Sequence, residues 1–177
     1  MKNYLELKVP LTWNANWFVY LRNTLRREGI DIKWKKKSTF HITAVFVEDI
    51  EHVVALRDVF DRVLGQSKAP SLTIDKIGVF QAKNTKKIIV HLDSTKKDEE
   101  LMPLINALRE GALQLGAHIE DFLFHITLGE SERIDIDLEQ TQRIIDTIHI
   151  PTFTLHITQV EYRYYHSGSI RKWKLSK

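Results

Sequence analysis

The sequence predicts one α+β domain that is built from two similar lobes. The prediction comes from apolar spacings typical of both helices and strands, and from a short pattern that occurs twice. Each half holds a helix, a short strand carrying Phe-His-Ile-Thr, an acidic segment and another helix. Because no Gly-, Ser- or Pro-rich linker separates the halves, we expect residues 1–177 to form a single bilobed domain.

The strands are predicted where apolar and polar side chains alternate, or where short apolar runs are bounded by turn residues. These segments are residues 4–11, 33–47, 72–80, 87–92, 122–128, 153–165 and 170–175. Polar residues 81–86 should form one hairpin turn, and Ser167-Gly168 should form the last.

The helices are predicted where apolar residues recur three or four positions apart. Their expected starts are Asn14 or Asn16, Asp49, about Asp98, and Asp137. The first three should end at Gly29, Gly65 and Gly116, because glycine readily adopts the backbone conformation that follows a helix.

The composition excludes several kinds of site. The 177 residues include no cysteine, which rules out disulfides, thiolate metal sites and cysteine nucleophiles. Neither a His-Glu-x-x-His motif nor a Gly-x-x-x-x-Gly-Lys loop is present, which argues against a zinc hydrolase and against ATP use. A net charge of +3 permits an anionic substrate without requiring one. We expect a cytoplasmic monomer that needs no membrane, metal or cofactor.

His41 and His125 hold the same place in the two Phe-His-Ile-Thr copies. Side chains alternate faces along a strand, so Thr43 should lie on the face of His41, and Thr127 on that of His125. Buried imidazole and hydroxyl groups are costly unless they have partners. The repeated pattern therefore indicates a site, although two unrelated strand histidines with satisfied hydrogen bonds would give the same pattern.

The same alternation predicts the faces of the residues that follow Thr43. Strict alternation puts Val45 and Val47 on the face of His41, and Phe46 on the opposite face, which is apolar enough to be core.

Two histidines suit the cleavage of a phosphodiester. One base must deprotonate the attacking oxygen and one acid must protonate the leaving oxygen, and imidazoles serve both roles near neutral pH without metal. The hydroxyls of Thr43 and Thr127 could donate hydrogen bonds to the phosphate oxygens, whose charge grows in the transition state. We favour His125 as the base and His41 as the acid, although the sequence does not decide between them.

A third His-Ile-Thr begins at His156. There Thr152, Thr154 and Thr158 share the face of the histidine, which is the polar face of a half-solvated strand. We therefore interpret His156 as an ordinary surface histidine.

The two motifs, their separation and the order of elements resemble the 2H phosphoesterases, which include 2′-5′ RNA ligase-like proteins and cyclic nucleotide phosphodiesterases. The resemblance covers nearly the whole chain and rests on TFHITAVFV, IGVFQ and FLFHITLG. It implies two βαβ-type lobes with antiparallel sheets around a central cleft. It also implies an acid/base pair at His41 and His125, with phosphate donors at Thr43 and Thr127.

The chain departs from the family pattern at two places. Glu130 stands three positions after Thr127, where the family often has arginine, and Val47-Glu48 replaces a frequent Leu-Gly. Cations that could take over the missing role are Lys87, Arg163 and Arg171.

Other candidate substrate contacts are aromatic. Trp34 lies among lysines and Tyr165 lies in a Tyr-rich strand, a composition that suits RNA or a nucleotide but also fits core aromatics beside solvated charges.

Three functional hypotheses follow. The first is a metal-independent phosphodiesterase acting on a 2′,3′-cyclic phosphate or a 2′-5′ linkage of RNA or a nucleotide. The second is a non-catalytic module that binds RNA or a nucleotide on the same fold. The third is a structural domain whose strand histidines only satisfy hydrogen bonds.

Overall fold

The computed structural model describes residues 2–11, 16–48, 51–96 and 99–177. The described strands are β1 (Asn3–Lys8), β2 (Ile32–Trp34), β3 (His41–Val47), β4 (Ser71–Ile74), β5 (Lys76–Gln81), β6 (Ile88–Asp93), β7 (Ile126–Ser131), β8 (Phe153–His156), β9 (Gln159–Tyr164) and β10 (Ser169–Lys174). The described helices are α1 (Asn16–Arg27), α2 (Val53–Gly65), α3 (Leu101–Gln114) and α4 (Leu138–Asp146).

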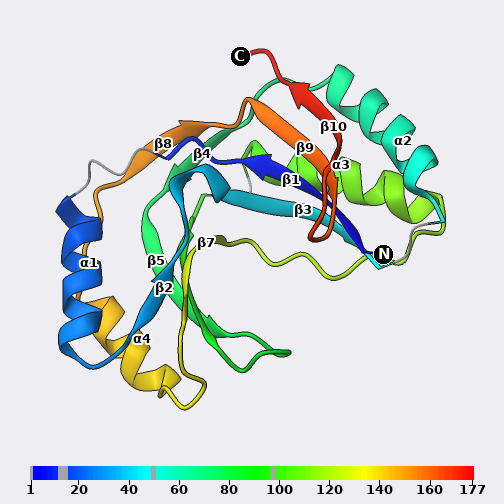
Figure 1. Ribbon diagram of the computed structural model, residues 1–177. Coiled ribbons are helices and arrows are strands. Elements are labelled where there is room, and N and C mark those ends of the chain that lie inside the picture. The colour runs from blue at the N-terminus through cyan, green and yellow to red at the C-terminus, as the bar shows by residue number, and fades with distance from the viewer. Residues whose placement is uncertain (1, 12–15, 49–50, 97–98) are drawn as a thin grey trace.

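Two four-stranded antiparallel sheets form the two lobes (Figure 1). Sheet A has the order β10-β9-β1-β3, and sheet B has the order β2-β7-β6-β5. A small antiparallel pair, β4 with β8, leads from one lobe to the other. The α+β class and the antiparallel sheets of two lobes are confirmed.

Each lobe draws on both halves of the chain. Helices α2 and α3 pack together beside sheet A, where the ring of Phe60 meets that of Tyr162 at 5.1 Å. Helices α1 and α4 cover sheet B, where Phe18 meets Trp34 at 5.1 Å. Sheet A thus combines N-terminal β1 and β3 with C-terminal β9 and β10. The lobes are therefore not consecutive halves of the chain.

Several predicted strands are broken where the chain passes between sheets. Segment 33–47 divides into β2 and β3 at a short 3-10 helix, Lys37–Thr39, where both the N–H and the hydroxyl of Thr39 donate to the Lys36 carbonyl. Segment 72–80 divides into β4 and β5 at Asp75, and segment 153–165 divides into β8 and β9. In the last two segments the apolar residues change from one alternate set of positions to the other at the break, and the continuous strands that we predicted pass over that change.

The helix ends agree well with their sequence signals. The carboxylate of Asp137 accepts a hydrogen bond from the Gln140 N–H at 2.9 Å and caps α4 as predicted. Gly29 and Gly116 follow α1 and α3 with φ of +75° and +78°, which favours glycine there. The described part of α2 begins at Val53 after His52, which makes no side-chain cap. The predicted starts at Asn14, Asp49 and Asp98 lie outside the described residues.

None of the helices in the described ranges has the length and apolar character that crossing a bilayer requires.

Candidate active site at the meeting of two bulged strands

Both motif strands contain a β-bulge just after the threonine. In the β1–β3 pairing, Leu5 faces Val45 but Glu6 faces Thr43, so Ala44 is an extra residue. In the β6–β7 pairing, Val90 faces Gly129 but His91 faces Thr127, so Leu128 is extra in the same way. A bulge shifts the alternation of side chains by one residue. The residue three positions after each threonine therefore returns to the threonine's face.

This shift corrects the predicted faces of the first strand. Val45 and Val47 are fully buried in the core, whereas Phe46 is half-buried on the side of His41. The ring of Phe46 stacks with that of Tyr4 at 6.1 Å, and Tyr4 in turn lies 6.1 Å from the His41 ring. Phe46 is thus part of an aromatic group at the site rather than part of the core.

The two candidate histidines are held in the same way. His41 Nδ1 lies 2.8 Å from the Thr39 carbonyl, and His125 Nδ1 lies 2.8 Å from the Leu123 carbonyl. Because a carbonyl can only accept, Nδ1 must carry the hydrogen in both rings. Each neutral ring therefore leaves Nε2 free to take or give a proton.

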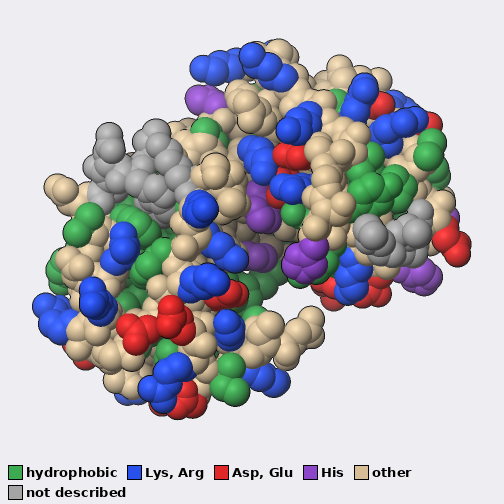
Figure 2. Space-filling model, viewed as in Figure 1, with side chains coloured by type: hydrophobic (Ala, Val, Ile, Leu, Met, Phe, Trp, Pro, Cys, Tyr) green, Lys and Arg blue, Asp and Glu red, His purple; other side chains and the backbone are tan. Residues whose placement is uncertain are grey.

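The fold brings the two motifs together. Strands β3 and β7 are in contact, and the charge of His41 helps to lower the pKa of His125. Figure 2 shows histidine side chains gathered at the hollow between the lobes, with lysine and arginine side chains around it. The site is thus cationic at its rim and has imidazoles at its centre.

His125 lies in an apolar environment. Burial is the main cause that lowers its pKa, and the hydrogen bond to the Leu123 carbonyl acts in the opposite direction. The Phe80 ring stands edge-on at 5.3 Å, and the His91 ring lies at 6.3 Å. These surroundings favour the neutral form of His125, which is the form that a general base needs.

His91 is a third histidine of the site that the sequence analysis did not identify. It is 7% exposed, pairs with Thr127 and packs over Gly78, where an added Cβ would lie 2.7 Å from the ring. Burial, followed by the charge of His125, lowers the pKa of His91 to about 4. The only sequence signal was the Gly-x-Phe of β5, since glycine leaves room for a ring opposite it.

The low pKa of His91 predicts acid sensitivity of the fold. The unfolded ring titrates near pH 6.5, so the unfolded state binds a proton before the folded state does. Stability should therefore fall as the pH drops below about 6.5, by about 2 kcal/mol from this residue between pH 7 and pH 5. Urea unfolding of wild type and His91→Gln at both pH values measures the effect. Equal losses in the two proteins would contradict the prediction.

His41 has a different environment. Its Nδ1 lies 3.5 Å from Oε2 of Glu6, a carboxylate on β1 that is 1% exposed. The other oxygen, Oε1, forms ion pairs with Lys8 and, at 3.5 Å, with Arg163. The two histidines therefore share a backbone geometry but differ in electrostatic surroundings.

The other candidate substrate contacts differ in where they lie relative to the two histidines. Lys87 Nζ lies 3.9 Å from Glu130 Oε1. This cation is therefore next to Glu130, the residue that replaces the arginine often found in the family. Arg163 pairs with Glu6, and Tyr165 meets Phe46 edge-on at 5.7 Å. Trp34 packs on Phe18 of α1, on the helix-covered face of sheet B. The structure therefore does not bring Trp34 to the histidines, because its neighbour Lys33 occupies the open face.

Thr43 and Thr127 are both half-buried, each on the same face of its strand as the bulge-shifted residue, Phe46 or Glu130. His156 lies apart in the β4–β8 pair, where it is exposed and its Nδ1 is 3.3 Å from the Ser71 hydroxyl. The third His-Ile-Thr is thus in neither motif sheet.

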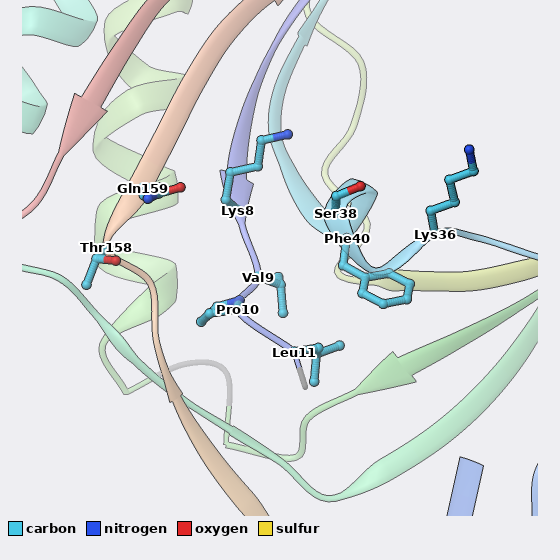
Figure 3. Close-up of a pocket in the computed structure, with 9 residues that line it drawn as sticks. All are labelled: Lys8, Val9, Pro10, Leu11, Lys36, Ser38, Phe40, Thr158 and Gln159. Carbon is cyan, nitrogen blue, oxygen red and sulfur yellow. The ribbon is translucent and has the colours of Figure 1, made fainter. Parts of the chain in front are cut away.

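Two cavities are lined by neighbours of the candidate histidines. The first, of about 700 Å³, lies beside Lys8, the cross-strand partner of His41. Figure 3 shows apolar Val9, Leu11 and Phe40 in its lining, with the amino groups of Lys8 and Lys36 extending to the same side. The second, of about 340 Å³, is lined by Phe80, His91, Asp93, Met102 and residues 122–124, which lead into His125.

Within the part of the chain that the structure describes, no group of three or more His, Cys, Asp or Glu side chains is placed to hold a metal ion.

Comparison with known proteins agrees with this geometry. A model of the LigT-like phosphoesterases matches residues 14–90, which include the first motif. Nearly the whole chain also superposes on solved phosphoesterase structures. The family model thus matches the first part of the chain, and the likeness to solved structures shows the fold of nearly all of it. No curated protein matches it in sequence.

Two solved structures illustrate the shared fold. E. coli LigT complexed with 3′-AMP is 15% identical, with a TM-score of 0.56 over 99% of this chain and 98% of that chain. Kluyveromyces marxianus Usb1 with uridine monophosphate is 7% identical, with a TM-score of 0.70 over 98% of both chains. At these identities the likeness shows the fold of the chain.

Proposed function

We propose that this protein is a metal-independent phosphodiesterase that acts on a 2′,3′-cyclic phosphate or a 2′-5′ linkage of RNA or a nucleotide. The observation that carries the proposal is the pair of bulged His-x-Thr strands. His41 opens β3 and His125 directly precedes β7. Each imidazole has Nδ1 at a backbone carbonyl and Nε2 available for proton transfer, and each strand carries a threonine hydroxyl two positions after its histidine.

The electrostatic difference between the histidines supports their roles. His125, whose pKa is lowered by burial, is the better base, and its Nε2 would accept a proton from the attacking water. His41, beside the Glu6 carboxylate, is the better acid, and its Nε2 would protonate the ribose oxygen as the P–O bond breaks. The water oxygen forms the new bond to phosphorus, and both protons are accounted for without a metal.

The substrate class is supported by the surroundings of the histidines. Two cavities are lined by sequence or cross-strand neighbours of the histidines, and their apolar linings would suit the nucleoside groups attached to a phosphodiester. Lysine and arginine side chains around the hollow favour an anion. The structures of E. coli LigT with 3′-AMP and of Usb1 with uridine monophosphate hold nucleotides on the same fold.

One observation favours a second candidate, a non-catalytic module that binds RNA or a nucleotide. Glu130 occupies the bulge-shifted position of the second motif on the open face, and its carboxylate would repel a phosphate held by Thr127. Lys87 at 3.9 Å offsets part of that charge, which is why we prefer the enzyme.

A substrate panel tests the proposal. Purified protein is incubated with 2′,3′-cyclic nucleotides, cyclic-phosphate RNA ends and 2′-5′-linked dinucleotides, each with and without EDTA, and the products are separated by chromatography. We expect turnover of at least one substrate class at a rate that EDTA leaves unchanged. Tight binding of the panel without any product would favour the binding module, and turnover abolished by EDTA would contradict a metal-free mechanism.

A further inference from the structure

Glu6 is a buried carboxylate at the centre of the open face of sheet A. Its side chain is 1% exposed, and its cross-strand neighbours are Thr43 on β3 and Glu161 on β9. A buried charge is costly unless it is paired, so its partners indicate why it is there. Glu6 has three of them: Lys8, Arg163 and His41.

The two carboxylate oxygens face different groups. Oε1 faces the two permanent cations, Lys8 and Arg163, which fix the carboxylate in place. Oε2 faces Nδ1 of His41 at 3.5 Å, while the same Nδ1 donates to the Thr39 carbonyl at 2.8 Å. The ring hydrogen thus bonds to the Thr39 carbonyl, while the Glu6 carboxylate lies at ion-pair distance from the same nitrogen and can attract the protonated ring.

His125 lacks an equivalent arrangement. Within the described part of the chain its Nδ1 is hydrogen-bonded to the Leu123 carbonyl, and its ring neighbours are Phe80 and His91. Asp93 favours the charged form of His125, but it is the weakest of the causes acting on that ring's pKa. The carboxylate thus distinguishes one lobe from the other.

We propose that Glu6 is the positioning residue that makes His41 the general acid and so fixes the direction of the reaction, leaving His125 as the base. The inference rests on the proposed function. Glu6 orients the His41 ring through Nδ1 and holds the proton on it until the leaving oxygen takes it from Nε2. The other titratable or charged groups that face His41 or Glu6 are Tyr4 and Lys8 on β1, Arg163 and Glu161 on β9, and His125 on the far side of the hollow.

The first measurement is the pH profile of Glu6→Gln on a 2′,3′-cyclic nucleotide. We expect kcat to fall about tenfold to a hundredfold, the range found when the partner that orients a histidine is removed, with little change in KM. The high-pH limb of the kcat profile should move to lower pH, because the neutral amide no longer holds the acid's proton. A kcat loss with an unmoved limb would overturn the proposal.

Glu161→Gln is the matched control. Glu161 is also a buried carboxylate on the same face, 8% exposed, and it pairs with Lys8 and Lys172. It isolates the effect of losing a buried charge from the effect of losing the contact with His41. We expect Glu161→Gln to keep the wild-type position of the high-pH limb, and an equal displacement in both variants would overturn the proposal.

A second substrate distinguishes the residue that acts as the general acid from the residue that acts as the general base. A p-nitrophenyl phosphodiester of a nucleotide has a leaving oxygen that needs no proton. On this substrate Glu6→Gln should regain near wild-type kcat, whereas His125→Ala should stay impaired. Recovery of His125→Ala instead would reverse the assignment and overturn the proposal.

Separate measurements report the folding of each variant and the proposed function. Thermal unfolding by circular dichroism is recorded for each variant. If Glu6→Gln does not fold, Glu6→Asp, which keeps the charge for Lys8 but withdraws it from the ring, should show the same displacement to a smaller extent. Wild-type turnover reports the proposed function, and its absence on both substrates would overturn both proposals. The ratio of variant to wild type reports the role of Glu6.

Discussion

His125→Ala is expected to lower kcat on a 2′,3′-cyclic phosphate by about a hundredfold to ten-thousandfold, the usual contribution of a positioned acid or base. Burial lowers the pKa of wild-type His125, and the Leu123 carbonyl fixes its Nδ1, which leaves Nε2 to take a proton. Alanine removes the only group in this environment that we propose as the base. His41→Ala should cost a similar factor, because the leaving ribose oxygen departs poorly without a proton.

The chain supplies its own control for this experiment. His156→Ala removes the histidine of an identical His-Ile-Thr tripeptide, and this histidine is exposed at the end of β8. Its kcat should equal that of wild type. Near wild-type rates for either His41→Ala or His125→Ala would exclude the two-histidine mechanism. A loss in His156→Ala as large as theirs would show that the assay reports stability rather than chemistry.

Thr43→Val and Thr127→Val are each expected to lower kcat by about a hundredfold, as the loss of one fixed donor to a charged transition state does. Both threonines lie half-buried on the open faces of their strands, directly beside the histidines of the same motifs. Valine keeps the shape and removes the hydroxyl, so the strands should keep their pairing. Because the phosphate oxygens gain charge in the transition state, kcat should fall more than KM rises.

Thr154→Val provides the comparison for the threonines. Thr154 is exposed on β8, where its hydroxyl lies 3.3 Å from that of Thr73, and we expect its loss to leave kcat unchanged. Steady-state kinetics of the three variants on one cyclic nucleotide gives the result. A rise in KM with an unchanged kcat in both motif variants would mean that the hydroxyls bind the substrate and its transition state equally.

The sequence predicted only part of the strand face that carries His41. Alternation correctly put Thr43 beside His41, because the two residues lie within one regular stretch of strand. It failed three residues later, where the bulge at Ala44 turned Phe46 toward the site and Val45 into the core. A bulge is a property of the pairing between two strands, and the sequence of one strand does not contain its partner.

The sequence by itself determined the repeated motif, the helix ends at Asp137, Gly29 and Gly116, and the pair of histidines that we propose for catalysis. These depend on local backbone preferences and on identities that can be read directly. The tertiary structure alone decided that β9 and β10 complete the sheet of the first motif, that His91 lies beside His125, and that Glu6 lies beside His41. Those neighbours come from distant parts of the chain, and the packing that buries them creates the difference between the two histidines.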